Sequence, residues 1–435
     1  MTSKRFIKNT FLLILGGMIT KILGFVIKIL YTRYLKSEGV SLITLIFPTY
    51  TLLLTISGFA LPLAITKLIA ENKERKSKIV FSSLWITYSI NIVLITIVIL
   101  SSNYFAINIL HEPRCSFLIK ILAFTLPFVS TTSIIKAYFF GLENIKPIVL
   151  SNISEELIKL TLILTFLPKY SLKSPIYGVT FYLFINFACE VTSFFILSIF
   201  LPKKIKLKDL SYRYDQQCVN EITKISVPTL SGRLIGSIGY FFEPIILTNL
   251  LIYKSMNASI IRLNYGYFGG YVIGLLTIPS FFLSAISSNM IPAISKLKIK
   301  NDYKRIKAFL SKIIILVLLC GLFFTTTLYF YGKNIMYLLY KTTSGYKYLK
   351  ILLPAFILFY LESPLFSSLQ SLDQEKKVLK ITTLGLLIKY LSLIFLIMLN
   401  KGFMSLIISE IINIIFVISL CIYYLKKAFR CFSQQ

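Results

Sequence analysis

Apolar runs of about 20 residues recur along nearly the whole length of this 435-residue chain. A run of that length crosses the roughly 30 Å hydrocarbon core of a bilayer as one α-helix, in which every backbone polar group is paired internally. No stretch is left over that could form a sizeable soluble domain. The sequence therefore predicts an all-α, polytopic membrane protein of about twelve transmembrane helices. The predicted spans are residues 9–31, 40–62, 79–101, 119–141, 147–168, 176–200, 224–251, 266–291, 310–331, 350–370, 378–399 and 403–424.

Basic charge is the second unusual feature: 47 Lys and Arg stand against 17 Asp and Glu, a formal net charge of +30. In a soluble protein this excess would suggest a nucleic-acid partner. Here most cations fall on one side of the predicted topology, which the positive-inside rule makes the cytoplasm. We therefore expect a bacterial inner-membrane protein with both termini cytoplasmic, in contact with anionic membrane lipid and not with nucleic acid. The basic segments are the N-terminus, residues 73–78, 203–213 and 296–307, and the tail.

The two halves of the chain resemble each other. The segment 62–68 recurs at 292–297, and residues 157–159 recur at 387–389, 230 positions later. Residues 20–24 correspond to 232–236 at a shorter offset. Matches in the same order at similar spacing indicate an internal duplication.

Six helices per half is an even number, so both halves keep the same orientation and are related by a pseudo-two-fold axis along the membrane normal. Parallel repeats of this kind are a transporter architecture, in which two bundles rock about a shared site. We expect an N-terminal six-helix bundle at 1–200, a basic cytoplasmic linker at 201–221 and a C-terminal six-helix bundle at 222–435.

Beyond the first three residues of each span, twelve charged residues interrupt the predicted spans. A charge at the bilayer centre costs about 2.5–3.5 kcal/mol on insertion scales, so they are expected to face protein or water. Lys28, Lys136 and Glu410 lie nearer to helix ends, where a long side chain can extend to the interface. The others are Lys21, Glu155, Glu156, Lys159, Glu190, Arg233, Glu243, Glu362 and Lys389.

Cations in corresponding positions of the two halves suggest an anion site. Lys21 corresponds to Arg233, and Lys159 to Lys389, so the proposed axis would place two pairs across one cavity. Lys and Arg are the usual partners of phosphate. We therefore predict that the four bind a diphosphate headgroup whose lipid tail stays in the bilayer. Asn152, Glu155, Glu156 and Lys159 share one helical face, which is expected to look inward; an intrahelical bridge from a glutamate to Lys159 is the alternative.

Acidic residues in the second half are candidates for energy coupling. Glu243, Glu362 and Glu410 could bind sodium or a proton, and the alternative is structural pairing with Lys389 or Arg233. No nucleophile–base constellation, metal-ligand spacing or nucleotide motif is visible. We expect no catalytic residue, no resident metal and no cofactor other than a coupling Na⁺ or H⁺.

Motifs of the first half resemble a known family. The run 137–141, then Pro147, Ser151-Asn152 and residues 155–159, looks like the Gly-Tyr-Phe-x-Gly, Pro, Ser-Gln and Glu-Gln-x-x-Arg pattern of the stage V sporulation protein B group. Residues 20–25 with Lys28 and Arg33 are similar to its first-helix pattern. That group belongs to the multidrug/oligosaccharidyl-lipid/polysaccharide (MOP) flippase superfamily, with lipid II flippases as relatives. Three motif arginines are lysine here: Lys21, Lys28 and Lys159.

The resemblance implies a flippase that moves an undecaprenyl-diphosphate-linked glycan precursor, such as a peptidoglycan or polysaccharide unit, from the inner to the outer leaflet by alternating access. It adds Lys28, Arg33, Asn152 and Glu155 to the substrate-binding candidates. A monomer is expected, with enzymes of cell-envelope synthesis as candidate partners. A cation-coupled multidrug antiporter of the same superfamily is the alternative. A membrane enzyme acting on lipid-linked sugars and a structural scaffold are the readings from other classes.

Overall fold

A computed structural model describes residues 3–71, 75–202, 215–299 and 302–433 of the chain. This described part is built from helices and contains no β-strand, which confirms the predicted fold class. It divides into two compact units, Met1–Phe242 and Glu243–Gln435, so that the boundary falls inside one long helix, α8 (Gln216–Tyr253). Most of the predicted linker, residues 203–214, lies outside the described residues, and the proposed division at 201–221 stays a prediction.

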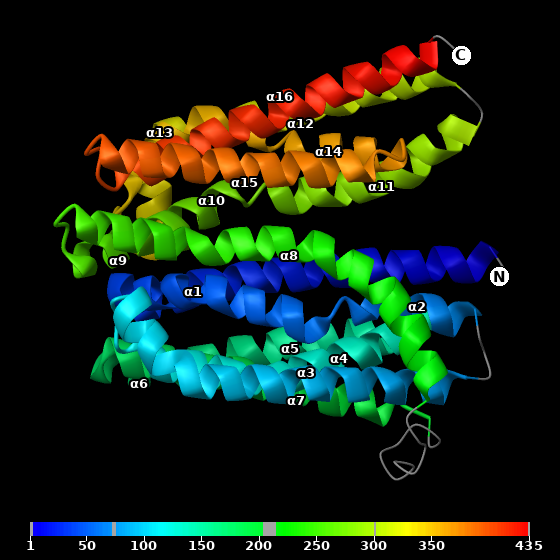
Figure 1. Cartoon of the computed structure of the whole chain (residues 1–435), viewed down its shortest axis with the longest axis horizontal. Coiled ribbons are helices and arrows are strands. Elements are labelled where there is room, and N and C mark those ends of the chain that lie inside the picture. The colour runs from blue at the N-terminus through cyan, green and yellow to red at the C-terminus, as the bar shows by residue number, and fades with distance from the viewer. Residues whose placement is uncertain (1–2, 72–74, 203–214, 300–301, 434–435) are drawn as a thin grey trace. The chain divides into compact units, whose positions relative to one another are not determined.

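In the described part of the first unit, seven helices precede α8 (Figure 1). Its first helix covers two predicted spans and bends between them at Lys36, whose φ of 54° is outside the helical region. A one-residue kink thus takes the place of the expected loop. The helices are α1 (Ser3–Gly58), α2 (Leu61–Glu71), α3 (Lys76–Tyr104), α4 (Cys115–Gly141), α5 (Lys146–Thr165), α6 (Leu167–Lys173) and α7 (Pro175–Ile199), and a π-helical turn, Phe105–Ile109, extends α3.

The second unit continues α8 and adds eight helices among its described residues. Two predicted spans are broken: 266–291 passes through a π-helical segment, Tyr267–Ile273, and a turn at Pro279, and 350–370 is interrupted after Phe359. The helices are α9 (Ala258–Gly266), α10 (Gly274–Leu276), α11 (Ser280–Ile299), α12 (Tyr303–Tyr340), α13 (Tyr346–Phe359), α14 (Glu362–Ser371), α15 (Glu375–Met398) and α16 (Met404–Ser433).

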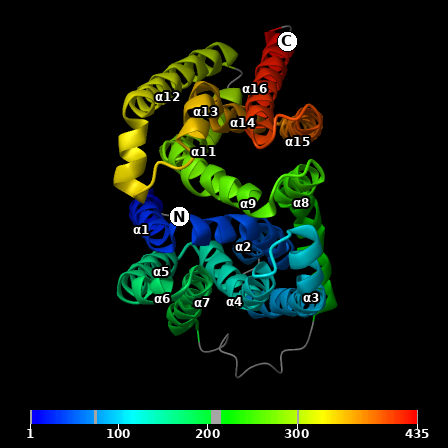
Figure 2. The ribbon, with the colours of Figure 1, turned by 90° about the vertical axis from the view of Figure 1, so that its left-hand side faces the viewer.

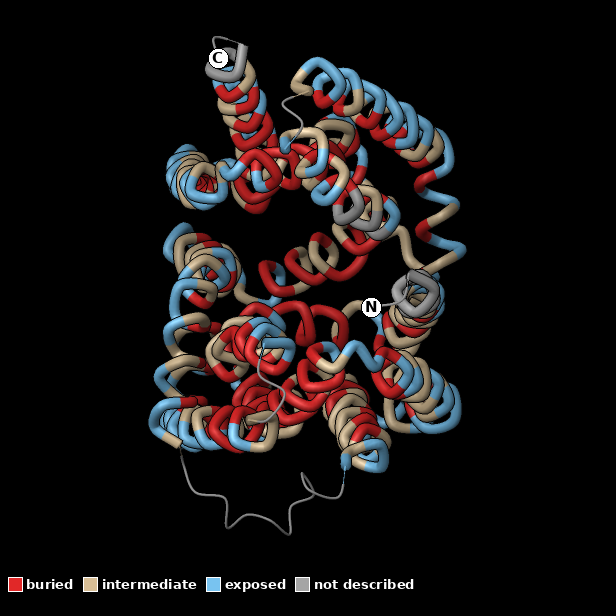
Figure 3. The backbone as a smooth tube through the Cα atoms, turned by 90° about the vertical axis from the view of Figure 1, so that its right-hand side faces the viewer, coloured by how far each residue is buried: buried red, intermediate tan, exposed pale blue. Residues whose placement is uncertain are grey.

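The burial pattern is that of a protein in lipid. Within each unit the buried residues line the contacts between helices, and exposed residues cover the outer faces (Figure 3). Those outer faces carry many large apolar side chains, such as Leu100 and Phe323, which are 79% and 77% exposed. Water would disfavour apolar patches of this extent, whereas acyl chains solvate them. The chain is therefore a multi-pass membrane protein.

Nine helical stretches of the described chain are long and apolar enough to cross a membrane. This number is lower than the roughly twelve predicted transmembrane helices for three reasons. Phe11–Glu71 counts once although it covers two predicted spans, α5 carries three charges near its middle, and the span at 266–291 is divided among α9, α10 and α11. The predicted spans are thus helical, and the charged and broken ones mark the regions where function is expected.

Close helix packing in the first unit depends on Gly141, at the end of α4. A Cβ atom there would lie 2.8 Å from Ile69 Cβ and 3.0 Å from the backbone oxygen of Thr66, both in α2. We expect Gly141→Ala to destabilise the protein by about 1–3 kcal/mol, because backbone cannot yield as a side chain can. Unfolding in detergent would measure this. Gly17→Ala is the matched control, since nothing lies within 4 Å of its added methyl group.

The start of α8 is attached to the first unit by polar contacts. Asp215 accepts a hydrogen bond from the backbone amide of Gln217 at 3.0 Å, and its carboxylate lies 3.3 Å from Lys78 Nζ. Arg75 lies 3.4 Å from Glu221 of α8. Desolvation acts to raise the pKa of Asp215, but hydrogen bonds from the backbone amide of Cys218 and from Lys78 outweigh it and hold this pKa below its usual value. The first turns of α8 therefore stay tied to α3 at neutral pH.

Candidate functional site

Three helices of the first unit bring charged side chains together in the membrane region. Lys136 of α4 lies 3.6 Å from Glu155 of α5, and both side chains are largely shielded from solvent. Figure 2, which views the helices nearly end-on, shows α4, α5 and α7 as neighbours. Glu155 is therefore paired with Lys136 on a neighbouring helix. Among the described residues no ion pair within 4 Å joins it to Lys159, which was the intrahelical alternative. We call Lys136, Glu155, Glu156, Lys159 and Glu190 the first-unit cluster.

The third helix, α7, contributes a carboxylate and an aromatic ring. Glu190 accepts a hydrogen bond from Thr132 of α4 at 3.2 Å, and it lies near enough to Glu155, Lys136 and Lys159 to interact with them electrostatically. The ammonium of Lys159 lies 6.0 Å from the centre of the Tyr182 ring, at the outer limit of a cation–π contact. Among the described residues no carboxylate lies within 4 Å of the Lys159 ammonium, although Glu156 and Glu190 interact with it at longer range.

The first helix presents its lysines toward the same cluster. Lys21, Gly24 and Lys28 follow one another at i, i+3 and i+7 and so share a face of α1. A methyl group at Gly24 would lie 3.9 Å from Glu156 Oε1 on α5, which fixes the direction of that face. Glu156 Oε2 is buried without a hydrogen-bond partner among the described residues. The face of α1 that carries Lys21 and Lys28, the lysine face, is therefore turned toward the charged face of α5.

The remaining first-unit candidates lie on the same helices or on α8. Asn152 is partly buried on α5, one turn before Glu155, and Arg33 lies on α1 just before the kink at Lys36. Arg233 is exposed on the part of α8 that belongs to the first unit. The predicted meeting of Lys21, Lys159, Arg233 and Lys389 at one site stays a prediction.

The second unit has an ion cluster of its own. Lys389 Nζ on α15 lies 2.5 Å from Glu243 Oε2 on α8 and 2.6 Å from Glu410 Oε2 on α16. The hydroxyl of Tyr265 on α9 donates to the other oxygen of Glu243 at 3.1 Å. Both Lys389 and Glu243 are buried, at 9% and 5% exposure. We call Glu243, Lys389 and Glu410 the second-unit triad. Both glutamates pair with Lys389, which was the structural alternative to a coupling role.

A glycine explains why α15 and α16 approach closely enough for this contact. Gly385 lies one turn before Lys389, and a Cβ atom there would lie 2.6 Å from Val417 Cγ2 and 2.9 Å from Asn413 Oδ1 on α16. Asn413 in turn lies one turn after Glu410. The absence of a side chain at Gly385 thus lets the two helices pack together at the level of the triad.

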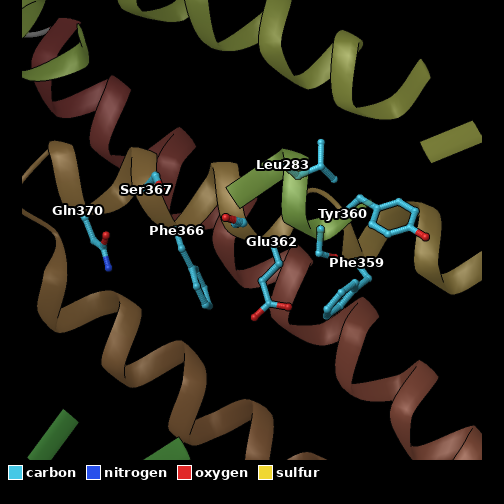
Figure 4. Close-up of a pocket in the computed structure, with 9 residues that line it drawn as sticks. Leu283, Phe359, Tyr360, Glu362, Phe366, Ser367 and Gln370 are labelled. Carbon is cyan, nitrogen blue, oxygen red and sulfur yellow. The ribbon is translucent and has the colours of Figure 1, made fainter. Parts of the chain in front are cut away.

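Glu362 lines a cavity at the break between α13 and α14. The cavity has a volume of about 440 Å³ and is lined by hydroxyl, amide and aromatic groups and by Leu283, together with this single carboxylate. In Figure 4 Glu362 lies between Phe359 and Phe366, with Gln370 and Ser367 farther along α14. A carboxylate in such a cavity can bind a proton or a cation, and the coupling role predicted for Glu362 stays a prediction.

Sequence reasoning missed several partners. Lys136 and Glu410, for which extension to the interface was favoured, are instead paired with neighbouring helices. Thr132, Tyr182 and Tyr265 were not singled out, because hydroxyl and aromatic residues are frequent in membrane helices and carry no distinctive spacing.

Comparison with known proteins identifies the family. The model of the family described as polysaccharide biosynthesis protein matches residues 6–298, more than half of the chain and all of its first unit except the first five residues. The chain belongs to the polysaccharide biosynthesis protein family. The matched region of this polysaccharide biosynthesis protein includes both the first-unit cluster and the lysine face of α1.

Relatives of this polysaccharide biosynthesis protein include two sporulation proteins of Bacillus subtilis (strain 168). Stage V sporulation protein B is 27% identical over 89% of this chain and 77% of its own length, which confirms the predicted resemblance. Sporulation protein YkvU is 22% identical over 83% of this chain and 81% of its own length. The lipid II flippase MurJ of the same organism is 23% identical over 38% of this chain and 32% of its own length.

Solved transporter structures share the fold of this polysaccharide biosynthesis protein. A multidrug resistance MATE family transporter of the MOP superfamily, in an inward-facing conformation, aligns with a TM-score of 0.76 at 12% identity over 96% of each chain. A MOP superfamily transporter from Pyrococcus furiosus, described as having a binding pocket of reverse polarity, aligns with a TM-score of 0.61 at 14% identity, over 98% of this chain and 95% of its own. The MATE-type fold that the sequence predicted is confirmed.

Proposed function

We propose that this protein is a flippase that carries an undecaprenyl-diphosphate-linked glycan precursor from the inner to the outer leaflet of the bacterial inner membrane. The observation that carries the proposal is the family match over residues 6–298, which includes the helices that bear the unusual cations. Flippase and sporulation relatives support it. We further propose that both termini are cytoplasmic and that the protein acts as a monomer.

The chemistry of the first unit supports a diphosphate as the bound group. A diphosphate carries several negative charges over a few ångströms, and ammonium groups in a water-poor region attract it more strongly than in bulk water. Lys21 and Lys28 share one face of α1, and Lys159 stands opposite on α5 without a carboxylate in contact. We assign these lysines, with Arg33 and Arg233, to the diphosphate.

Polar groups next to the cations are suited to the sugar. The side chain of Asn152 can both donate and accept hydrogen bonds. It lies on α5, one turn before Glu155 and Glu156. Glu155, held by Lys136, can accept from glycan hydroxyl or amide groups. We assign Asn152 and Glu155 to the glycan, while the lipid tail remains in the bilayer. Lys389 is not assigned to the diphosphate, because an anion would have to displace the two carboxylates that hold it.

Transport follows an alternating-access cycle in this proposal, with both orientations of the site using the same cations. No nucleotide motif was found in the sequence, so the energy is assigned to the membrane potential, a proton gradient or consumption of the product in the outer leaflet. Moving one charge through the full potential is worth about 2.3 kcal/mol per 100 mV. Glu362, in its cavity, is the candidate for proton coupling.

Reconstitution tests the function. Purified protein in liposomes is expected to move fluorescent undecaprenyl-diphosphate-linked glycan between leaflets, scored by quenching of the outer leaflet, at least about tenfold faster than protein-free liposomes. A panel of organic drug cations, accumulated by the same vesicles under a sodium or proton gradient, tests the antiporter alternative. Drug accumulation without lipid movement would replace the flippase proposal with that alternative.

A further inference from the structure

The second-unit triad has the form of a cation site that is already filled. Carboxylate oxygens from α8 and α16 converge on one point, and the ammonium of Lys389 occupies it at 2.5 and 2.6 Å. Two carboxylates on different helices are the oxygen donors that hard cations prefer. Tyr265 fixes the orientation of Glu243 by donating to its second oxygen.

Charge balance explains why this position needs a cation. Glu243 and Glu410 bring two negative charges into buried surroundings, where two unneutralised carboxylates would repel each other strongly. A third carboxylate, Glu362 on α14, lies near enough to Glu410 to interact with it electrostatically. The ammonium is therefore the local counter-charge for the carboxylates contributed by α8 and α16.

We propose that Lys389 is a tethered cation that fills the place of a free coupling ion between Glu243 and Glu410, so that this unit requires no sodium. Because the ammonium is part of the chain, it loses no translational freedom on binding, and a free monovalent cation at ordinary concentration cannot compete with it. The inference concerns the ion dependence of this unit, and it stands or fails independently of the proposed flippase function.

Removing the tether should expose the site. In Lys389→Ala the two carboxylates face each other across the vacated position, and a sodium ion can enter. A ligand that binds the folded state alone raises its stability in proportion to the logarithm of its concentration above Kd. We expect the Tm of Lys389→Ala in detergent to rise by on the order of 5 °C between choline chloride and 100 mM sodium chloride at constant ionic strength.

The matched controls lie on the same helix and at the same site. Wild type and Lys380→Ala, whose lysine is exposed on α15, are expected to show no such difference between sodium and choline. Lys389→Arg keeps a tethered cation and should also be insensitive. If Lys389→Ala does not fold, Lys389→Ala combined with Glu410→Gln retains one carboxylate and balances the lost charge, and a weaker sodium response is expected from it.

The outcomes separate cleanly, and none depends on a transport assay. A sodium response confined to variants that lack the ammonium supports the tethered cation. A saturable rise in the Tm of wild type with sodium overturns it, because the site would then accept a free ion beside Lys389. The absence of a response in both Lys389→Ala and the double variant overturns it as well, because the two carboxylates would then form no cation site.

Discussion

Lys389→Met is expected to lower the free energy of unfolding by about 3–5 kcal/mol, the range observed when one partner of a buried ion pair is removed. The methionine, one atom shorter than the lysine, fills most of its space but leaves Glu243 and Glu410 with no counter-charge on α15. Denaturant or thermal unfolding of the purified protein in detergent and choline buffer measures the loss.

Glu410→Gln should behave differently, because the triad holds two carboxylates and one ammonium. Neutralising one carboxylate leaves a balanced pair between Lys389 and Glu243, so a loss below about 1.5 kcal/mol is expected. Lys380→Met, an exposed position on the same helix, should change stability by less than about 0.5 kcal/mol. Equal losses in Lys389→Met and Glu410→Gln would show that charge balance is not what the triad provides.

Transport is expected to fall by about 10- to 100-fold in Lys159→Ala and in Lys21→Ala, because each removes one charge-assisted contact worth roughly 1.5–3 kcal/mol. Lys159→Arg keeps the charge and offers two parallel donors, so it should retain at least the wild-type rate. The measurement is the initial rate of leaflet exchange of the fluorescent glycan lipid at limiting substrate.

Lys169→Ala is the control for this pair of variants, because Lys169 is exposed on α6 and outside the first-unit cluster. It should transport at the wild-type rate with the same amount of protein reconstituted. Wild-type rates in both Lys21→Ala and Lys159→Ala would exclude these lysines from the substrate site, and a matching loss in Lys169→Ala would point to a general effect of surface charge.

Much of the fold could be predicted because the bilayer leaves little choice: apolar runs of about 20 residues must be helices that cross it. The internal breaks were harder to predict. Residues 32–39 were expected to be a loop, yet α1 continues through them with a single strained residue at Lys36. The interruptions at Pro279 and after Phe359 depend on packing against neighbouring helices, which periodicity does not report.

The charged residues of the two clusters could be singled out from the sequence, whereas their contacts could not. Helical spacing places Asn152, Glu155 and Lys159 on one face of α5, but it cannot decide whether Glu155 turns to Lys159 or to Lys136. The partners of Lys389 come from two other helices, one of them 146 positions earlier in the chain, and their meeting depends on how α8, α15 and α16 are rotated. A single sequence carries no information on that rotation.

The proposal that the cations of α1 and α5 hold a diphosphate is tested most directly by comparing two lipids that differ by one phosphate. Liposomes containing the wild-type protein would be supplied with undecaprenyl-diphosphate-linked and undecaprenyl-monophosphate-linked forms of the same fluorescent glycan, and leaflet exchange would be measured for each. The diphosphate form is predicted to move at least about tenfold faster, and this preference should shrink in Lys159→Ala. Equal rates for the two lipids would contradict a site built to bind a diphosphate.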